Sequence, residues 1–306
     1  MTFKKELPSS YTAKLAFLSV VFAWSTSWLM IKFQVEKVPE GLSVAYRFLG
    51  ASLVLFTIAK LNNFPLKFTK SQHRLIFLQG INLFFFNHLF FYSAIHYVSS
   101  GVAATFSALS VITVPVIDYF VHKTKLSSKL FTGAILGIIG VILISSSEIN
   151  VDHFDKNIAK GLFFCSLGVI SFSFGSVIGK ELKLNNMKVL ISSTAFSMLY
   201  GATLSLLVGW AVHKNLSFDF SPSYIFSLLY LILIPGILGY CAILFLVDKV
   251  GSANAAYTAL LYPVFALILS GIFEDYKFTI FTILGIVLVI AGNLIALRAR
   301  KKQHIK

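Results

Sequence analysis

The chain has 306 residues, of which 57% are hydrophobic and only 12% are charged, whereas a typical soluble domain has about 25% charged residues. This composition excludes an ordinary soluble fold and favours helices that cross a bilayer, which need about 20 apolar residues each. The formal net charge of +14 would suggest a nucleic-acid partner in a soluble chain, but in a membrane protein the positions of the charges report topology. We therefore predict a polytopic membrane protein whose partners are the lipid bilayer and a small-molecule substrate, with no nucleic acid.

Apolar runs separated by charged or turn-rich breaks predict an all-α fold with ten transmembrane helices. The first run is too long for a cleavable signal core, so it is kept as a span. Cys165 and Cys241 fall inside apolar runs with no motif around them, which is typical of small buried hydrophobic residues. The ten predicted spans lie near 15–33, 41–59, 75–96, 101–121, 129–147, 160–179, 189–211, 223–247, 252–273 and 279–297.

Basic residues are unevenly divided between the two alternating sets of predicted loops. Most of the 26 Lys and Arg residues fall in one set, which includes Lys67, Lys70, Lys123 and Lys129 and the basic end of the chain. Because Lys and Arg accumulate in cytoplasmic loops, we predict a multi-pass protein of the cell inner (cytoplasmic) membrane with both termini in the cytoplasm.

An internal repeat appears at an offset of 152 residues. The stretch 98–104 (Val-Ser-Ser-Gly-Val-Ala-Ala) lies over 250–256 (Val-Gly-Ser-Ala-Asn-Ala-Ala), and without a gap Gly133 lies over Gly285 and Gly140 over Gly292. Five helices in each half is an odd number, so the second half must enter the membrane from the opposite side, which predicts two inverted five-helix repeats. The predicted units are 14–147, 157–298 and a basic cytoplasmic tail, 299–306.

Four stretches carry a pattern that belongs to a known family. They are 24–28 (Trp-Ser-Thr-Ser-Trp) with Ile31 and Lys32, 47–49 (Arg-Phe-Leu), 97–104, and 250–256 with Tyr262 and Pro263. Over nearly its whole length the sequence resembles the EamA family of the drug/metabolite transporter superfamily. The resemblance implies a secondary transporter that works by alternating access, and it names a substrate only weakly, because the family's substrate range is wide.

Polar side chains inside apolar spans are the default candidates for a site, since they are costly unless they face protein or water. In the ninth span Asn254, Thr258 and Tyr262 recur at i, i+4 and i+8, which places them on one helix face. Ser110 in the fourth span and Ser173 in the sixth are further candidates. For these serines, close helix packing is the alternative interpretation.

Aromatic and basic residues of the first span form a second group. Trp24 and Trp28 share a face one turn apart and could form an apolar wall or a platform for a ring or cation. Lys32 lies one turn beyond Trp28, where it could contact a charged group or extend to the lipid headgroups.

The third and second spans contribute the remaining candidates. Asn87 and His88 lie near the middle of the third span, with Tyr92 one turn later. His88 could relay protons, bind substrate or serve helix packing. Arg47 is the one basic residue inside a predicted span and away from a loop, and it could either reach the interface or attract a carboxylate or phosphate.

The interior lacks paired carboxylates, which disfavours a sodium site. Asp118 and Asp248 lie only near span ends. We therefore expect a neutral or zwitterionic organic solute, first an amino acid or a related compound. Uptake of a nucleotide-like or cofactor-like metabolite is the alternative within transport. A polytopic membrane enzyme is disfavoured, because no cluster of catalytic residue types is present. We expect no catalytic residue, cofactor or metal, and either a monomer or a homodimer.

Overall fold

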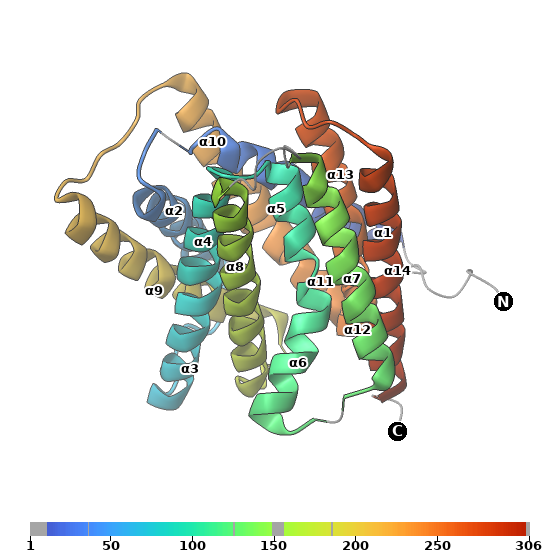
Figure 1. Cartoon of the computed structure of the whole chain (residues 1–306). Helices are drawn as coiled ribbons and strands as arrows, with labels where there is room; N and C mark the ends of the chain where they lie inside the picture. Colours follow the sequence, from blue (N-terminus) through green and yellow to red (C-terminus); the bar gives the residue numbers. More distant parts are fainter. Residues whose placement is uncertain (1–10, 36, 125, 149–155, 185, 304–306) are drawn as a thin grey trace.

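The computed structural model describes residues 11–35, 37–124, 126–148, 156–184 and 186–303, and every regular element in these ranges is a helix (Figure 1). The predicted basic tail continues the last helix as far as residue 303, and its end, 304–306, lies outside the described residues, as does most of the predicted connection 148–156. In chain order the elements are α1 (Tyr11–Lys32), α2 (Glu40–Leu61), α3 (Lys70–Gly80), η2 (Ile81–Phe86), α4 (Asn87–Ile95), α5 (Ser100–Ser107), α6 (Ser110–His122), α7 (Ser128–Ser145), η3 (Ser146–Glu148), α8 (Lys156–Glu181), α9 (Met187–His213), α10 (Pro222–Leu233), η4 (Ile234–Gly239), α11 (Tyr240–Val250), α12 (Ser252–Ala255), α13 (Thr258–Phe273) and α14 (Ile280–Gln303).

Within the described ranges, eight continuous helical runs are long and apolar enough to cross a membrane. They confirm an all-helical protein with many membrane spans. Two of the predicted spans, 101–121 and 252–273, differ from the others because each is broken. The pair α5 and α6 is bent by 40°, and would bring the count to nine if taken as one span, while α13 is apolar but shorter. The total of ten stays a prediction.

Both breaks are short turns of the tighter 3₁₀ type. In the first, the amide of Leu109 donates to the carbonyl of Phe106 at 3.0 Å, and in the second the amide of Tyr257 donates to Asn254 at 3.1 Å. Each of the helices that follow, α6 and α13, carries an internal proline, Pro115 or Pro263. Proline lacks the amide hydrogen that an α-helix needs, so the broken spans have weaker backbone bonding near the middle of the bundle.

Two further spans contain a π-helical turn. Between α3 and α4 lies η2, and between α10 and α11 lies η4, which contains Pro235. Side chains compensate the altered backbone bonding around η2, because the amide of Asn82 donates to the carbonyl of Leu78 at 2.8 Å. π-helical turns often occur at functional sites, and here they recur at corresponding places in the two halves of the chain.

Glycines let α7 and α14 approach closely along their length. A Cβ atom on Gly133 would lie 2.6 Å from the carbonyl oxygen of Gly292, and one on Gly140 would lie 2.6 Å from that of Gly285. The helices are therefore antiparallel, and each glycine meets the repeat equivalent of the other glycine. Such crosswise pairing is the pattern of a two-fold axis. The pairing supports the inverted repeat. The orientation of the two repeats in the membrane and their boundaries stay predictions.

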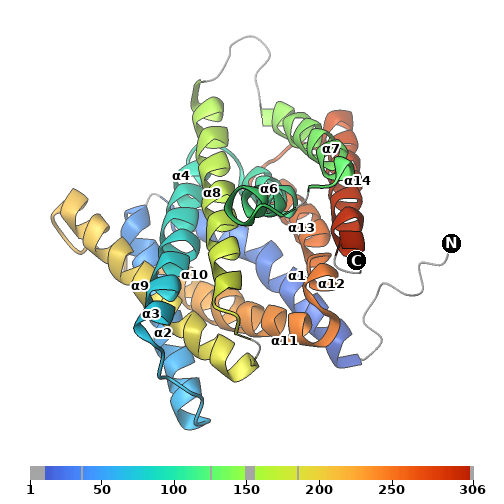
Figure 2. The same cartoon turned by 90° about the horizontal axis from the view of Figure 1, so that it is seen from below.

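The helices α2 and α9 make a second antiparallel pair. The hydroxyl of Ser205 donates to the carbonyl of Gly41 at 2.7 Å, and that of Ser52 donates to the carbonyl of Ala195 at 2.9 Å. Seen from below, α2, α3, α4 and α9 lie on one side, α7, α13 and α14 on the other, and α8 and α6 between them (Figure 2). The two sides of the bundle therefore meet along α8, α6 and α1.

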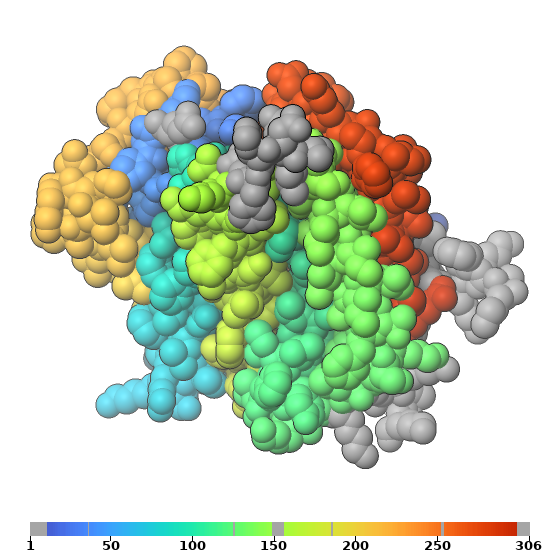
Figure 3. Space-filling model, viewed as in Figure 1, coloured from blue at the N-terminus to red at the C-terminus, as the bar shows by residue number. Residues whose placement is uncertain are grey.

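The outer surface is rich in large apolar side chains. Figure 3 shows the side where α8 and α7 lie in front. On α7, the exposed residues include Phe131, Ile135, Ile138 and Ile142. On α14, Ile280, Phe281, Ile283, Leu284 and Val287 are exposed as well. Contiguous exposed apolar surface of this kind marks contact with a partner or a membrane, and hydrocarbon lipid is the solvent that suits these helix faces.

Candidate functional site

A buried basic group lies on α2 with two of its nitrogen atoms unpaired. Arg47 is 3% exposed, and its Nε and Nη1 atoms have no hydrogen-bond partner among the described residues. The guanidinium lies close enough to His88, Tyr92 and Tyr240 for its charge to act on all three side chains. It lies about 10 Å along the helix axis from Glu40, the first residue of α2. Arg47 is therefore inside the bundle.

Tyr92 connects this arginine to a residue from the end of α1. The hydroxyl of Tyr92 donates to Oε1 of Gln34 at 2.8 Å. Gln34 is 0% exposed, and its Nε2 atom has no partner in the described part of the chain. Arg47, Tyr92 and Gln34, which we call the Arg47 cluster, thus present several free N–H groups in a buried place.

His88 stands beside this cluster on α4. Its Nδ1 lies 2.8 Å from the carbonyl oxygen of Leu83, and because a carbonyl can only accept, this nitrogen carries the hydrogen. The ring packs edge-on against Phe48 with centroids 4.5 Å apart, and it stacks on Phe84 at 6.4 Å. His88 thus satisfies a carbonyl of η2, while the proton relay stays a prediction.

A chain of aromatic contacts runs from the neighbourhood of the Arg47 cluster to Tyr262 on α13, in the second of the two broken spans. Tyr262 packs edge-on against Trp24 with ring centroids 5.7 Å apart, and Trp24 packs edge-on against Tyr240 at 6.4 Å. The rings of Tyr240 and Phe84 are tilted, with centroids 5.4 Å apart. The hydroxyl of Tyr262 is 2.7 Å from that of Ser107, the last residue of α5. We call Tyr262, Trp24, Tyr240 and Phe84 the aromatic line. It joins α13, α1, α11 and η2, and it ends next to the Arg47 cluster.

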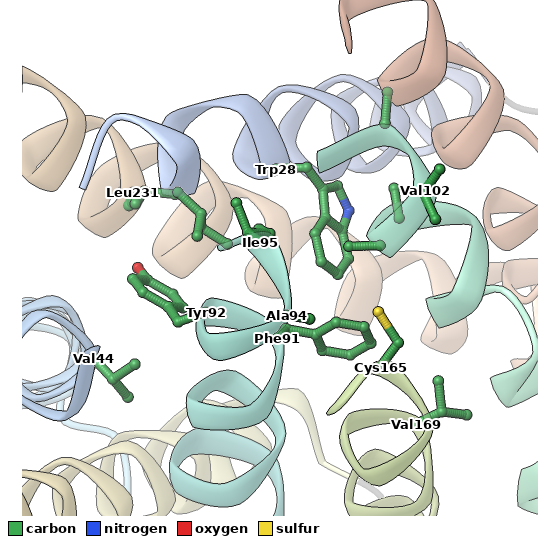
Figure 4. Close-up of a cluster of buried hydrophobic side chains, with 14 of the residues drawn as sticks. Trp28, Val44, Phe91, Tyr92, Ala94, Ile95, Val102, Cys165, Val169 and Leu231 are labelled. Carbon is green, nitrogen blue, oxygen red and sulfur yellow. The ribbon is translucent and has the colours of Figure 1, made fainter. Parts of the chain in front are cut away.

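Trp28 belongs to a separate group on the other side of α4. Its ring meets that of Phe91 edge-on at 4.9 Å, and both lie near Cys165, whereas Tyr92 points from α4 toward α2 (Figure 4). Trp28 and Cys165 are both buried. Cys241 is partly buried, so both cysteines occupy apolar surroundings.

Two predicted site residues hold α8 against its neighbours. The amide of Asn87 donates to the carbonyl of Gly168 at 2.9 Å. The hydroxyl of Ser173 is 2.5 Å from that of Thr113. These bonds fit the packing interpretation, and a substrate role for either residue stays a prediction.

Two further polar candidates, Asn254 and Thr258, bond to backbone carbonyls only three or four residues earlier in the chain. The hydroxyl of Thr258 donates to Ala255 at 2.9 Å, and the amide of Asn254 donates to Val250 at 2.8 Å. The carbonyl oxygen Oδ1 of Asn254 is buried without a partner among the described residues. Ser110 is partly buried at the start of α6. Tyr262 is thus the member of its predicted stripe whose described hydrogen bond reaches a distant part of the chain, at Ser107.

Polar groups tie the helices together at the end of the bundle where α5 begins. The carboxylate of Glu148 accepts from the backbone amide of Ser99 at 3.1 Å, and that of Glu274 accepts from the amide of Ser100 at 2.9 Å and from its hydroxyl. Carboxylates stabilise a helix N-terminus. Lys32 acts electrostatically on Glu148, and its Nζ lies 3.5 Å from the carbonyl of Ile95. Lys32 therefore belongs to this end and lies apart from the aromatic line.

A second polar cluster holds α6 to α8 at the opposite end. Lys180 pairs with Asp118 at 2.9 Å, and His122 bridges Asp118 at 3.0 Å and Glu181 at 2.5 Å. The two clusters close the two ends of the same broken span, and the aromatic line lies between them.

Comparison with known proteins identifies the family. The model of the EamA-like transporter family matches the chain twice, over residues 12–146 and 159–298. The chain belongs to this family. A probable amino-acid metabolite efflux pump of Salmonella typhimurium is 25% identical over 300 residues, which are 94% of this chain and 96% of that protein. An uncharacterised transporter of Buchnera aphidicola subsp. Schizaphis graminum is 27% identical over 255 residues, 82% and 83% of the two chains.

The fold is also found in a solved structure. A crystal structure of a protein with 19% identity superposes with a TM-score of 0.66 and covers 96% of this chain and 99% of that chain. The family match confirms the predicted EamA-type membrane transporter, and the matched relatives carry the names of transporters or efflux pumps.

Sequence reasoning missed part of the site of this EamA-like transporter. Gln34 lies beyond the predicted end of the first span at 33, so it was assigned to a loop. Tyr240 and Phe84 follow or lie within π-helical turns, which have no sequence signal of their own. The buried position of Arg47 gave the strongest signal, because a charge inside a span needs a partner.

Proposed function

We propose that this EamA-like protein is a secondary transporter that moves a small organic metabolite, first an amino acid or a related compound, across the cytoplasmic membrane by alternating access. Both termini lie in the cytoplasm in this proposal. The observation that carries it is the aromatic line ending at the unpaired guanidinium of Arg47, deep inside a bundle of apolar helices. An aromatic wall with a few polar groups is typical of sites for small organic ligands.

The arrangement of the helices supports alternating access. Crosswise glycine contacts between α7 and α14 fit a pseudo-two-fold axis, and transporters built from inverted repeats place their site near the middle of such an axis. One polar cluster lies at the start of α5 and another at the end of α6. In the proposed mechanism, the contacts of one cluster break while those of the other stay intact.

The names of the relatives favour an amino-acid metabolite over the alternatives. The Salmonella relative is called a probable amino-acid metabolite efflux pump. For a nucleotide-like solute, several phosphate charges would need several cations, yet Arg47 is the sole Lys or Arg classed as buried within the described ranges. A polytopic enzyme is disfavoured because the relatives are named as transporters.

Counterflow in proteoliposomes tests the proposal. Vesicles containing the purified full-length chain are loaded, in separate samples, with an unlabelled mixture of amino acids, nucleotides or vitamins, and each sample is then diluted into trace amounts of the same compounds in labelled form. We expect accumulation of at least one labelled amino acid above the level in protein-free vesicles. Accumulation of nucleotides alone would select the alternative solute, and no accumulation of any compound would reject the proposed function.

A further inference from the structure

The Arg47 cluster has a charge that the described chain leaves unbalanced. No carboxylate among the described residues pairs with Arg47, although the guanidinium is almost fully buried. A buried ion without a partner is strongly unfavourable. An intramembrane charge with this cost is expected to serve a ligand.

Free hydrogen-bond donors converge with this charge. Besides Nε and Nη1 of Arg47, Nε2 of Gln34 is buried without a partner in the described ranges. The side chain of Gln34 accepts from the hydroxyl of Tyr92, and the charge of Arg47 acts on the same hydroxyl, so both side chains lie around Tyr92. A ligand that accepts several N–H bonds and carries negative charge would satisfy all three groups, and a guanidinium matches a carboxylate in shape.

The surroundings restrict the rest of the ligand. Arg47 is followed by Phe48, and the line of rings through Phe84 and Tyr240 starts beside it. These side chains offer apolar faces, and they suit a ring or another apolar body. A single guanidinium balances a single negative charge. The ligand class is thus an organic monocarboxylate with an apolar or aromatic body.

We propose that Arg47, Gln34 and Tyr92 form a subsite for the carboxylate group of the transported metabolite, while the aromatic line holds its apolar body. This inference rests on the proposed transport function and specifies its substrate class. Because Arg47 is 3% exposed, the ligand reaches the subsite only when the surrounding helices separate.

A matched set of probes isolates the carboxylate. Counterflow is measured with labelled L-phenylalanine and 3-phenylpropionate, which carry the carboxylate, and with L-phenylalaninamide and phenethylamine, which lack it. We expect uptake of the two acids and at least about 30-fold weaker apparent affinity for the amide, as is typical when one partner of a buried charge pair is removed. Arg47→Lys should weaken the acids similarly, because an ammonium lacks the planar fork.

A carboxylate introduced into the chain beside Arg47 tests the subsite by thermal stability, independently of the counterflow assay. Gln34→Glu places an anion beside Arg47, so we expect a higher Tm of the purified chain and loss of the Tm increase that 3-phenylpropionate gives to the unmodified protein. Gln79→Glu is the matched control. Gln79 accepts from Ser197 at the α3–α9 contact, and no basic partner of Gln79 appears among the described contacts, so this variant should not raise the Tm.

The outcomes separate the subsite from the transport function. Equal uptake of the acids and the amide, or a lower Tm for Gln34→Glu with normal binding of 3-phenylpropionate, would overturn the subsite and leave transport standing. If the unmodified chain takes up none of these probes and 3-phenylpropionate does not change its Tm, while another compound accumulates in the wider counterflow panel, the subsite fails and transport stands. If no compound accumulates in that panel either, the proposed function fails as well.

Discussion

Substituting the glycines between α7 and α14 should destabilise the protein in a pattern set by their pairing. A Cβ atom on Gly292 would lie 2.5 Å from the carbonyl oxygen of Gly133 and 2.8 Å from the amide nitrogen of Gly137. An ordinary contact needs about 3.4 Å or more, so Gly292→Ala must push the helices apart by roughly 1 Å. These two nearest neighbours are backbone atoms, which cannot rotate away.

The expected cost is that of overpacking a tight interface. Such changes cost about 1–3 kcal/mol, partly offset by the better helix propensity of Ala, about 1 kcal/mol. Gly133→Ala meets the same contact from the other side, 2.6 Å from the oxygen of Gly292. Because a single separation relieves both, the double variant should cost less than the two single changes together, by about 1 kcal/mol.

The assay is thermal unfolding of the purified chain in detergent, where about 1 kcal/mol corresponds to roughly 2–4 °C in Tm. Gly50→Ala is the control, since its new Cβ would meet only the flexible side chain of Ile232, and it should be neutral or stabilising. The pair Gly133 and Gly285, which are repeat equivalents and not in contact, should be closer to additive. If this pair couples more strongly than Gly133 with Gly292, or if Gly292→Ala raises the Tm, the crosswise pairing is wrong.

Four further substitutions test the site and the ends of the bundle. Trp28→Ala should reduce uptake in reconstituted vesicles without preventing membrane insertion, because it removes a buried ring. Normal uptake by that variant would show that the Trp28 ring is not needed for transport. Tyr262→Phe should reduce uptake and cost about 1 kcal/mol in stability, since a hydrogen bond is lost; normal uptake by this variant would contradict a role of the aromatic line in transport. A proton relay predicts that His88→Ala changes the pH profile of uptake, and an unaltered profile would exclude it. Asp118→Asn should cost under about 1 kcal/mol, because its partner Lys180 is 41% exposed; a larger drop in Tm than for Tyr262→Phe would show that this pair is stronger than its exposure indicates.

The sequence was sufficient for the helical membrane fold and the family, because long apolar runs and repeated glycines are local signals. Matching Gly133 with Gly285 along the sequence predicted the repeat, but not that Gly133 would contact Gly292, since contacts between halves depend on the axis that relates them. The breaks near Leu109 and Tyr257 were also missed, because apolar composition continues through them without interruption.

Candidate residues were harder to assign than spans, because a polar side chain has the same composition signal whether it packs or binds. Asn87 was predicted from its place in the third span, yet its amide is used by Gly168 on α8. Arg47 was noticed for its charge, but its lack of a partner depends on what the other helices bring near it. Tyr92 of this cluster was among the predicted candidates, whereas Gln34 lies in the turn after α1, outside the predicted spans.

The position of the break between α5 and α6 connects the site to both ends of the bundle. Ser107, the last residue before the break, is bonded to Tyr262 of the aromatic line. The start of α5 is held by Glu274, and the end of α6 is held by Lys180. Because the break has no continuous α-helical bonding, either end can move without carrying the other rigidly with it. In the proposed alternating access, a ligand that contacts Tyr262 would therefore act at the point where the two ends are joined.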